Sequence, residues 1–190
     1  GYVGAYEITG ETLWAVKYEI KFFDQYHHPS LIAGDMDGDG AEEVACLTPS
    51  NNLVIAEGAS GTLKKEMDIP GNPKSMSIAN LRGLGERDII LEYSQTHLRA
   101  ICADDAKLLW ETDKYKGIEH SPLKVMDLDG DGLDEVAGAS IIGHDGKRMN
   151  EWDLGDAYRS MVSLTVADIV PGGELEIALA EQRGGNSHTD

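Results

Sequence analysis

The sequence has few basic residues and no long apolar run, and each shortage excludes a class of function. Only 16 Lys and Arg residues stand against 34 Asp and Glu in 190 residues, which gives a formal net charge of −18. Such a chain lacks the basic face that phosphate backbones require, so we expect no nucleic acid partner, and the same charge disfavours anionic membranes. No apolar stretch approaches the roughly 18 residues of a spanning helix, so we expect no membrane insertion.

Cysteine is also scarce, since Cys46 and Cys102 are the two cysteines of the chain. Two cysteines do not make a disulfide framework, and each falls in a predicted strand of a different repeat. We therefore expect two isolated, buried thiols. No signal peptide opens the chain, and its first residue is Gly1 rather than Met, so we expect the start to be a processed or excised end.

The most informative feature that is present is an acidic stretch that occurs twice. Residues 35–43 read DMDGDGAEE, and residues 127–135 read DLDGDGLDE. Acids at positions 1, 3, 5 and 9 and a glycine at position 6 resemble the first part of an EF-hand calcium loop. Carboxylates about 4 Å apart repel by about 1 kcal/mol per pair in water and about 4 kcal/mol at an effective dielectric of 20, so the cluster needs a cation. The sequence therefore predicts two Ca²⁺ sites.

The predicted ligands are four carboxylates and one backbone carbonyl in each loop. They are Asp35, Asp37, Asp39, Glu43 and the Ala41 carbonyl in the first loop, and Asp127, Asp129, Asp131, Glu135 and the Leu133 carbonyl in the second. The bidentate glutamate at position 12 of an EF-hand is missing. Apolar runs at 44–47 and 136–139 follow instead, which favours a buried strand over an exiting helix. The alternative is a hydrophilic Asp-Gly turn without metal.

The two loops belong to a longer repeat, because their first residues lie 92 positions apart and a weaker copy stands midway between them. This copy at 80–88 and a fourth at 168–176 keep the acid at position 9 but lack the middle carboxylates. We expect neither to bind metal. In the copy at 80–88, the guanidinium of Arg82 would stand where calcium sits in the other loops.

A second signature alternates with the acidic loops and reads as a turn between two short strands. Its copies lie at 10–14, 61–65, 106–110 and 146–150. The residues before these turns, such as 53–56 and 98–102, are rich in apolar and β-branched side chains, and no stretch shows sustained 3.6-residue periodicity. The sequence thus predicts an all-β fold with about four strands per repeat, which is the content of one propeller blade.

This pattern predicts that residues 1–190 form one β-propeller segment of four-stranded blades. Whole blades are expected at 29–71, 72–116 and 117–157, and half blades at 3–20 and 158–190. The halves would pair to close a four-bladed ring, or both ends would be cuts through a seven- or eight-bladed propeller. We favour the cut, because residues 186–190 read as a loop that leads into a further strand.

The stretches 33–40 and 125–132, each followed by an acid and Val-Ala, resemble the FG-GAP or VCBS repeats of calcium-binding β-propellers. That family includes the head of integrin α-chains and many bacterial surface proteins, so it implies an extracellular or cell-surface location and a structural role for calcium. The stretch 119–154 is similar to blades of the propeller of rhamnogalacturonan lyases of polysaccharide lyase family 11. The Trp-bearing turns are similar to those of quinoprotein-like propellers.

Four residues that precede the acidic loops are candidates for a ligand site at one mouth of the propeller channel. They are His28, Lys74, His120 and Arg159. His28 and His120 each lie seven residues before the first Asp of their loop, so they occupy equivalent places in alternate blades. A cationic cluster suits an anionic ligand such as a uronate-bearing polysaccharide. The alternative is that these residues belong to solvated loops.

The sequence assigns no catalytic residues, because no Ser/His/Asp grouping, nucleophile elbow or phosphate loop is present. Trp14, Trp110 and Trp152 lie near the predicted turns, where we expect packing between blades, with sugar stacking as the alternative. Two functions remain open. One is a calcium-stabilised extracellular propeller that recognises polysaccharide, as the propeller part of a lyase. The other is an adhesion or assembly module that binds a protein partner at the propeller face and has no catalytic activity.

Overall fold

The structure is a computed structural model that describes residues 2–17, 31–94, 96–117, 123–149, 161–173 and 175–181. Within these ranges the chain consists of strands and turns, without a helix, which confirms the all-β prediction. It follows that the described residues include no helix able to cross a membrane.

The strands are short, as the frequent Gly and Asp turns predict. They are β1 (Val3–Tyr6), β2 (Thr12–Val16), β3 (Leu31–Gly34), β4 (Glu43–Leu47), β5 (Asn52–Glu57), β6 (Leu63–Asp68), β7 (Ser75–Ala79), β8 (Asp88–Ser94), β9 (His97–Cys102), β10 (Leu108–Thr112), β11 (Lys124–Met126), β12 (Glu135–Ala137), β13 (Ile141–Ile142), β14 (Met161–Ala167) and β15 (Glu176–Glu181).

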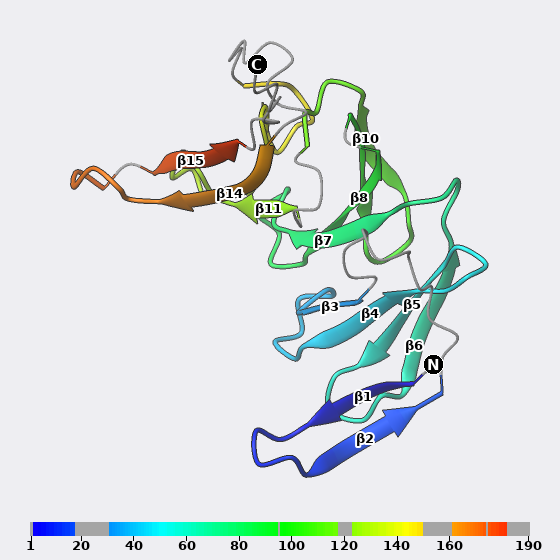
Figure 1. Cartoon of the computed structure of the whole chain (residues 1–190). Coiled ribbons are helices and arrows are strands. Elements are labelled where there is room, and N and C mark those ends of the chain that lie inside the picture. Colours follow the sequence, from blue (N-terminus) through cyan, green and yellow to red (C-terminus); the bar gives the residue numbers. More distant parts are fainter. Residues whose placement is uncertain are drawn as a thin grey trace, which may run out of the picture.

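Consecutive strands pair antiparallel in five separate sheets (Figure 1). Two sheets have four strands, in the orders β3-β4-β5-β6 and β7-β8-β9-β10. A third has the order β11-β12-β13, and an antiparallel bridge between Ile142 and Arg148 continues it where a fourth strand would stand. The hairpins β1-β2 and β14-β15 form the remaining two sheets.

Each sheet packs through an apolar core against the next sheet along the chain. Leu47 and Ile55 meet Met76 and Ile89 between the two four-stranded sheets. Separate cores join β7–β10 to β11–β13, β11–β13 to β14–β15, and β1–β2 to β4 and β5. Stacked sheets of this kind explain the apolar run that follows each acidic loop, because a strand with a core on both faces needs apolar residues at every position.

Strand β8 shows this arrangement residue by residue. Ile89 and Leu91 belong to the core shared with the preceding sheet, whereas Ile90 belongs to the core shared with the following one. All three are 0% exposed. The alternation follows from the two-residue period of a strand, which sends successive side chains to opposite faces.

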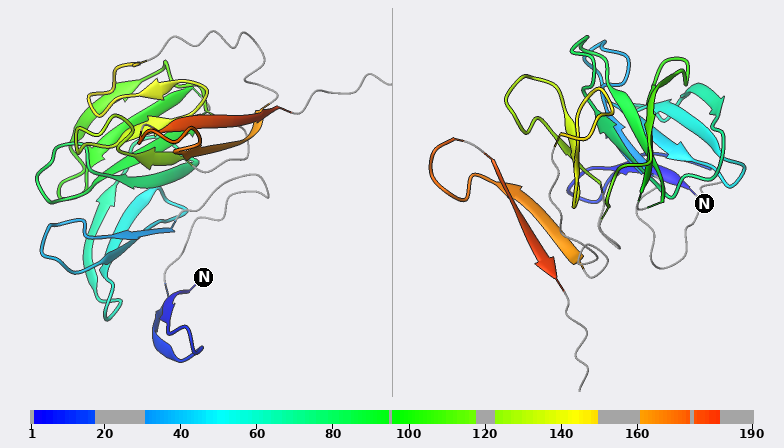
Figure 2. Two further views of the ribbon diagram at one scale, coloured as in Figure 1. Left: turned by 90° about the vertical axis from the view of Figure 1, so that its left-hand side faces the viewer. Right: turned by 90° about the horizontal axis from the view of Figure 1, so that it is seen from above.

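The first strands of successive sheets lie side by side, with β7 between β3 and β11. The sheets therefore follow one another around an arc, with β1-β2 and β14-β15 towards its two ends (Figures 1 and 2). Among the described residues these two hairpins are separate sheets that do not pair with each other. The number of blades and their predicted boundaries stay predictions.

The second signature supplies a contact that recurs between neighbouring sheets. The indole Nε1 of Trp14 donates to the Gly58 carbonyl at 2.7 Å, and Nε1 of Trp110 donates to the His144 carbonyl at 2.7 Å. Lys65 has the equivalent place in its repeat, and its Nζ donates to a carbonyl of the next sheet's turn at 3.0 Å. The expected packing role of the first two tryptophans is thus confirmed, and Trp152 lies outside the described residues.

The two cysteines are free and buried, as expected. Burial raises the pKa of the Cys46 thiol to about 11.

Candidate functional site

The two acidic loops occupy equivalent places, since 35–43 leads from β3 into β4 and 127–135 leads from β11 into β12. The first Asp of each loop organises the turn. Asp35 accepts hydrogen bonds from the backbone N–H of Gly38 at 2.7 Å and of Gly40 at 3.0 Å. Asp127 accepts from Gly130 at 2.7 Å and from Gly132 at 2.9 Å. These four glycines have φ between +78° and +88°, a conformation that favours glycine.

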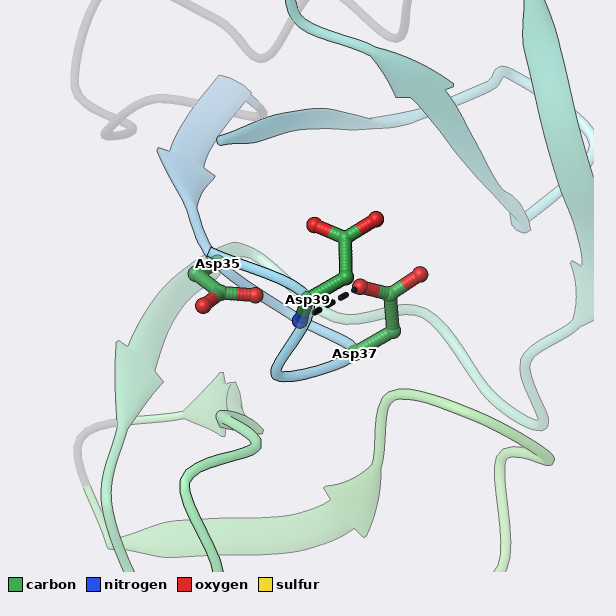
Figure 3. A group of neighbouring side chains, drawn as sticks. All are labelled: Asp35, Asp37 and Asp39. Carbon is green, nitrogen blue, oxygen red and sulfur yellow. Dashed lines mark hydrogen bonds between the residues drawn. The ribbon is translucent and has the colours of Figure 1, made fainter. Parts of the chain in front are cut away.

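This turn brings carboxylates together in both loops. One oxygen each from Asp35, Asp37 and Asp39 lies within 4.8 Å of the other two (Figure 3). In the second loop, the corresponding group consists of Asp127, Asp129 and Glu135. The structure therefore gathers six of the ten predicted metal ligands, all carboxylates, into two groups of three.

The other predicted ligands have the following surroundings. Oδ1 of Asp131 accepts a hydrogen bond from the Leu133 N–H at 2.8 Å, and Asp39 likewise bonds the Ala41 N–H at 2.7 Å. The Ala41 and Leu133 carbonyls stay predictions. Glu43 is the remaining predicted ligand, and its surroundings distinguish this loop from the others.

The acid at position 9 is buried in three loops, with exposures of 1% for Glu43, 0% for Asp88 and 1% for Glu135. One oxygen of Glu43 accepts the Met36 N–H at 2.9 Å, and one oxygen of Glu135 accepts the equivalent Leu128 N–H at 2.8 Å. The surroundings of the second carboxylate oxygen differ from loop to loop. Because burying a carboxylate without a partner costs several kcal/mol, what this second oxygen meets distinguishes the loops.

In the first loop the second oxygen meets Lys64 of β6. Its ammonium lies 2.9 Å from Oε1 of Glu43, 2.7 Å from Oδ2 of Asp37 and 3.9 Å from Oδ2 of Asp39. The hydrogen bond that Lys64 donates holds the pKa of Asp37 below its usual value, and the hydrogen bonds that Lys64 donates to Asp37 and Glu43 raise its own pKa. Sequence reasoning missed this lysine, because it lies 21 residues beyond Glu43 in a strand that looked purely structural.

In the loop 80–88 the partner is Arg82. Its Nη2 lies 2.8 Å from Oδ1 of Asp88, its Nε donates to the same oxygen at 3.0 Å, and Nη2 also pairs with Glu86 at 3.1 Å. The hydrogen bond to Asp88 raises the pKa of Arg82. The expectation that this guanidinium supplies the cation from the chain itself is confirmed.

In the loop 127–135 the second oxygen of Glu135 has no hydrogen-bond partner among the residues that the structure describes. This oxygen, Oε1, is buried. Burial raises the pKa of Glu135, and the neighbouring charges of Asp129, Asp131 and Asp127 raise it further. A buried carboxylate oxygen without a partner, beside two more carboxylates, fits a bound cation with oxygen ligands such as Ca²⁺.

The four residues predicted for ligand binding can be placed only in part. His28, His120 and Arg159 lie outside the described residues. Lys74 is exposed at the start of β7, where its backbone N–H donates to the Glu92 carbonyl at 2.6 Å. Burial raises the pKa of the Glu92 carboxyl, while a hydrogen bond from Ser75 and the charge of Lys74 oppose that rise.

A polar cleft of about 570 Å³, which no sequence motif predicted, lies between the end of β10 and the turn after β13. Its lining residues are His97, Glu111, Thr112, Asp113, Lys114, Gly146, Lys147 and Arg148. Arg99 fixes one wall, since its Nε lies 3.1 Å from Glu111 and its guanidinium lies 4.9 Å from the ring centre of Tyr93. The cleft joins segments that are distant in sequence, which explains why the pattern of repeats did not reveal it.

Comparisons with known proteins include a curated relative and solved structures. The chain is 27% identical over 233 aligned residues to rhamnogalacturonan endolyase YesW of Bacillus subtilis (strain 168), an alignment that includes 90% of this chain and 37% of that protein. The chain thus spans little more than a third of its relative. No protein-family model matches the sequence.

Among solved structures, BBS1N in complex with ARL6DN, soaked with lead, is similar with a TM-score of 0.52 and 12% identity, over 86% of this chain and 49% of that one. BamB from Moraxella catarrhalis gives a TM-score of 0.49 and 14% identity, over 79% of this chain and 42% of that one. The BBS1N chain is propeller-like, so the comparison supports a β-propeller type of fold for the stacked sheets.

Proposed function

We propose that this chain is a calcium-stabilised, extracellular or cell-surface propeller segment that recognises acidic polysaccharide, as part of a rhamnogalacturonan-lyase-like protein. The observation that carries the polysaccharide proposal is the similarity to a rhamnogalacturonan endolyase along 90% of the chain. The backbone of rhamnogalacturonan would present carboxylates, so the surface that recognises it needs cations as well as hydrogen-bonding groups.

The calcium proposal depends on the geometry of the loops. Asp127, Asp129 and Glu135 would hold one ion, and Asp35, Asp37 and Asp39 a second. Both groups lie at the turn between the first two strands of their sheets. Calcium there would neutralise crowded carboxylates and fix the turn, and its binding free energy would add to the stability of the fold.

The cleft beside β10 is the described surface that best suits a sugar. Its volume of about 570 Å³ falls in the usual range for ligand pockets. Lys114, Lys147 and Arg148 supply positive charge on a chain with a net charge of −18, whereas Glu111 and Asp113 can accept hydrogen bonds from hydroxyl groups. A mixed lining of this kind favours a uronate-bearing chain over a neutral one.

The test is a binding titration of the chain with rhamnogalacturonan, with polygalacturonate and with a neutral galactan. We expect binding to the two acidic polymers, weakened by Lys114→Glu and unaffected by Lys107→Glu, the same charge change at an exposed turn outside the cleft. An increase in unsaturated-uronate absorbance would identify a lyase, and binding without it would identify a recognition module. Equal binding of the neutral polymer, or none at all, would contradict the proposal.

The alternative is an adhesion or assembly module with a protein partner and no catalytic activity. The observation in its favour is the apolar surface of the β1–β2 hairpin, where Tyr2, Tyr6, Ile8 and Leu13 are between 57% and 107% exposed. Isolated apolar side chains are common on surfaces, but four within one hairpin favour a covering partner. If the titration shows no binding to any polysaccharide, the adhesion or assembly function becomes the favoured one.

A further inference from the structure

We propose that Lys64 is a tethered competitor of calcium in the loop 35–43, so that the two acidic loops bind the ion unequally and 127–135 fills first. This inference rests on the proposed calcium sites. The two loop sequences are nearly identical, so the difference comes from outside the loops, from one side chain of β6.

The first step of the argument is the place of the ammonium. It lies within 3.9 Å of Asp37, Asp39 and Glu43, which are three of the five predicted ligands of this loop. Calcium takes six to eight oxygen ligands at about 2.3 to 2.6 Å. An ammonium hydrogen-bonded to the same oxygens therefore has to leave before the ion can use them.

The second step is that Lys64 has another place to go. Its Nζ also lies 3.2 Å from Oε1 of Glu57, whose side chain is 37% exposed. Glu57 faces Glu43 directly in the β4–β5 register. The ammonium can keep Glu57 as a partner when it withdraws, so the competition is reversible and the site is weakened instead of abolished.

The third step is the comparison of the three loops with a buried acid. Lys64 meets Glu43, and Arg82 meets Asp88, but Glu135 lacks a partner for Oε1. In the repeat that contains the loop 127–135, the residue at the place of Lys64 is Met149, the fourth position of the second signature.

The same repeat also has no acid at the place of Glu57. The backbone N–H of Glu57 bonds the Thr62 carbonyl, and the N–H of Gly143 bonds the equivalent Lys147 carbonyl. Gly143 thus stands where Glu57 does. Neither charge that completes the loop 35–43 has a counterpart at these two positions beside the loop 127–135, and a bound metal ion would supply the cation that Glu135 lacks among the described residues.

The expected size follows from competition. The apparent dissociation constant of a site equals its intrinsic value divided by the fraction of time during which the site is free. An ammonium that occupies the site for nine-tenths of the time therefore weakens calcium binding about tenfold. We expect the loop 127–135 to bind calcium at least about tenfold more tightly than the loop 35–43.

The experiment is isothermal titration of chelator-stripped chain with calcium. The wild type should show two unequal sites, and Asp129→Ala and Asp37→Ala should each leave one, which assigns the strong site to 127–135. Lys64→Met introduces the residue type that Met149 supplies at the equivalent place. It should tighten calcium binding at the weak site about tenfold. Met149→Lys should weaken the strong site. Lys65→Met is the control, because it removes the same charge from a neighbouring lysine that bonds Asp104, so it should change the weak site much less than Lys64→Met does.

The outcomes separate this inference from the proposed function. No calcium binding by the wild type would overturn the calcium proposal itself. Two equal sites, or a weak site that Lys64→Met leaves unchanged, would overturn the role of Lys64 while calcium binding stands. Should Lys64→Met fail to fold, Lys64→Gln makes the same test with a polar side chain of similar length.

Discussion

The ammonium of Lys64 lies 2.9 Å from Oε1 of Glu43, a carboxylate that is 1% exposed. The same buried position in the loop 80–88 is an aspartate paired with an arginine, and in the loop 127–135 it is a glutamate with one oxygen that no described residue hydrogen-bonds. Each of these three loops therefore ends with a buried acid, and the loops differ in the cation that neutralises it.

Removal of the guanidinium from the loop 80–88 should destabilise the protein. Arg82→Met leaves Asp88, at 0% exposure, without its cation. Removing one partner of a buried ion pair lowers the free energy of unfolding by about 3 to 5 kcal/mol. Urea denaturation should show this loss, whereas Glu86→Gln, which removes the more exposed partner of Arg82, should cost less than about 1 kcal/mol. Equal effects of the two variants would show that burial of Asp88 is not the cause.

The turn at Gly146 should not tolerate alanine. Its φ is +80°, and an added Cβ would come within 2.8 Å of the Trp110 indole. Gly85 is the matched control, because its φ is +85° and the space around it is open. Thermal unfolding should show a loss of about 1 kcal/mol for Gly85→Ala from backbone strain alone. Gly146→Ala should lose distinctly more, and equal losses would contradict the packing role of Trp110.

Glu92 should make the stability depend on pH. Burial raises its pKa above the usual 4.5 in the folded chain. A carboxyl with a raised folded pKa contributes stability below its unfolded pKa, and this contribution is lost as the pH rises through the folded value. Glu92→Gln should therefore raise the melting temperature at pH 7, and the gain should disappear below about pH 4.5. A gain that persists in acid would show that ionisation of Glu92 is not the cause.

The sequence could predict features that repeat along the chain. The spacing of the acidic loops and of the second signature predicted all-β sheets, the place of each loop between two strands, and the pairing of Arg82 with its own loop. These depend on residues that are close in sequence. Lys64 was not predicted, because its contact with Glu43 depends on the register of three strands, β4 to β6. The cleft lined by His97 and Lys147 was missed for the same reason.

The most direct test of the central claim, that calcium holds the acidic loops, is thermal unfolding with and without a chelator. At free calcium about 100 times the dissociation constant, each occupied site adds about 2.7 kcal/mol. For a chain of this size that corresponds to a melting temperature higher by roughly 5 to 10 °C. Chelation should remove this gain, Asp129→Ala should remove the larger part of it, and substitution of Leu84 in the loop 80–88 should leave it unchanged. A melting curve that does not respond to chelator would contradict the account.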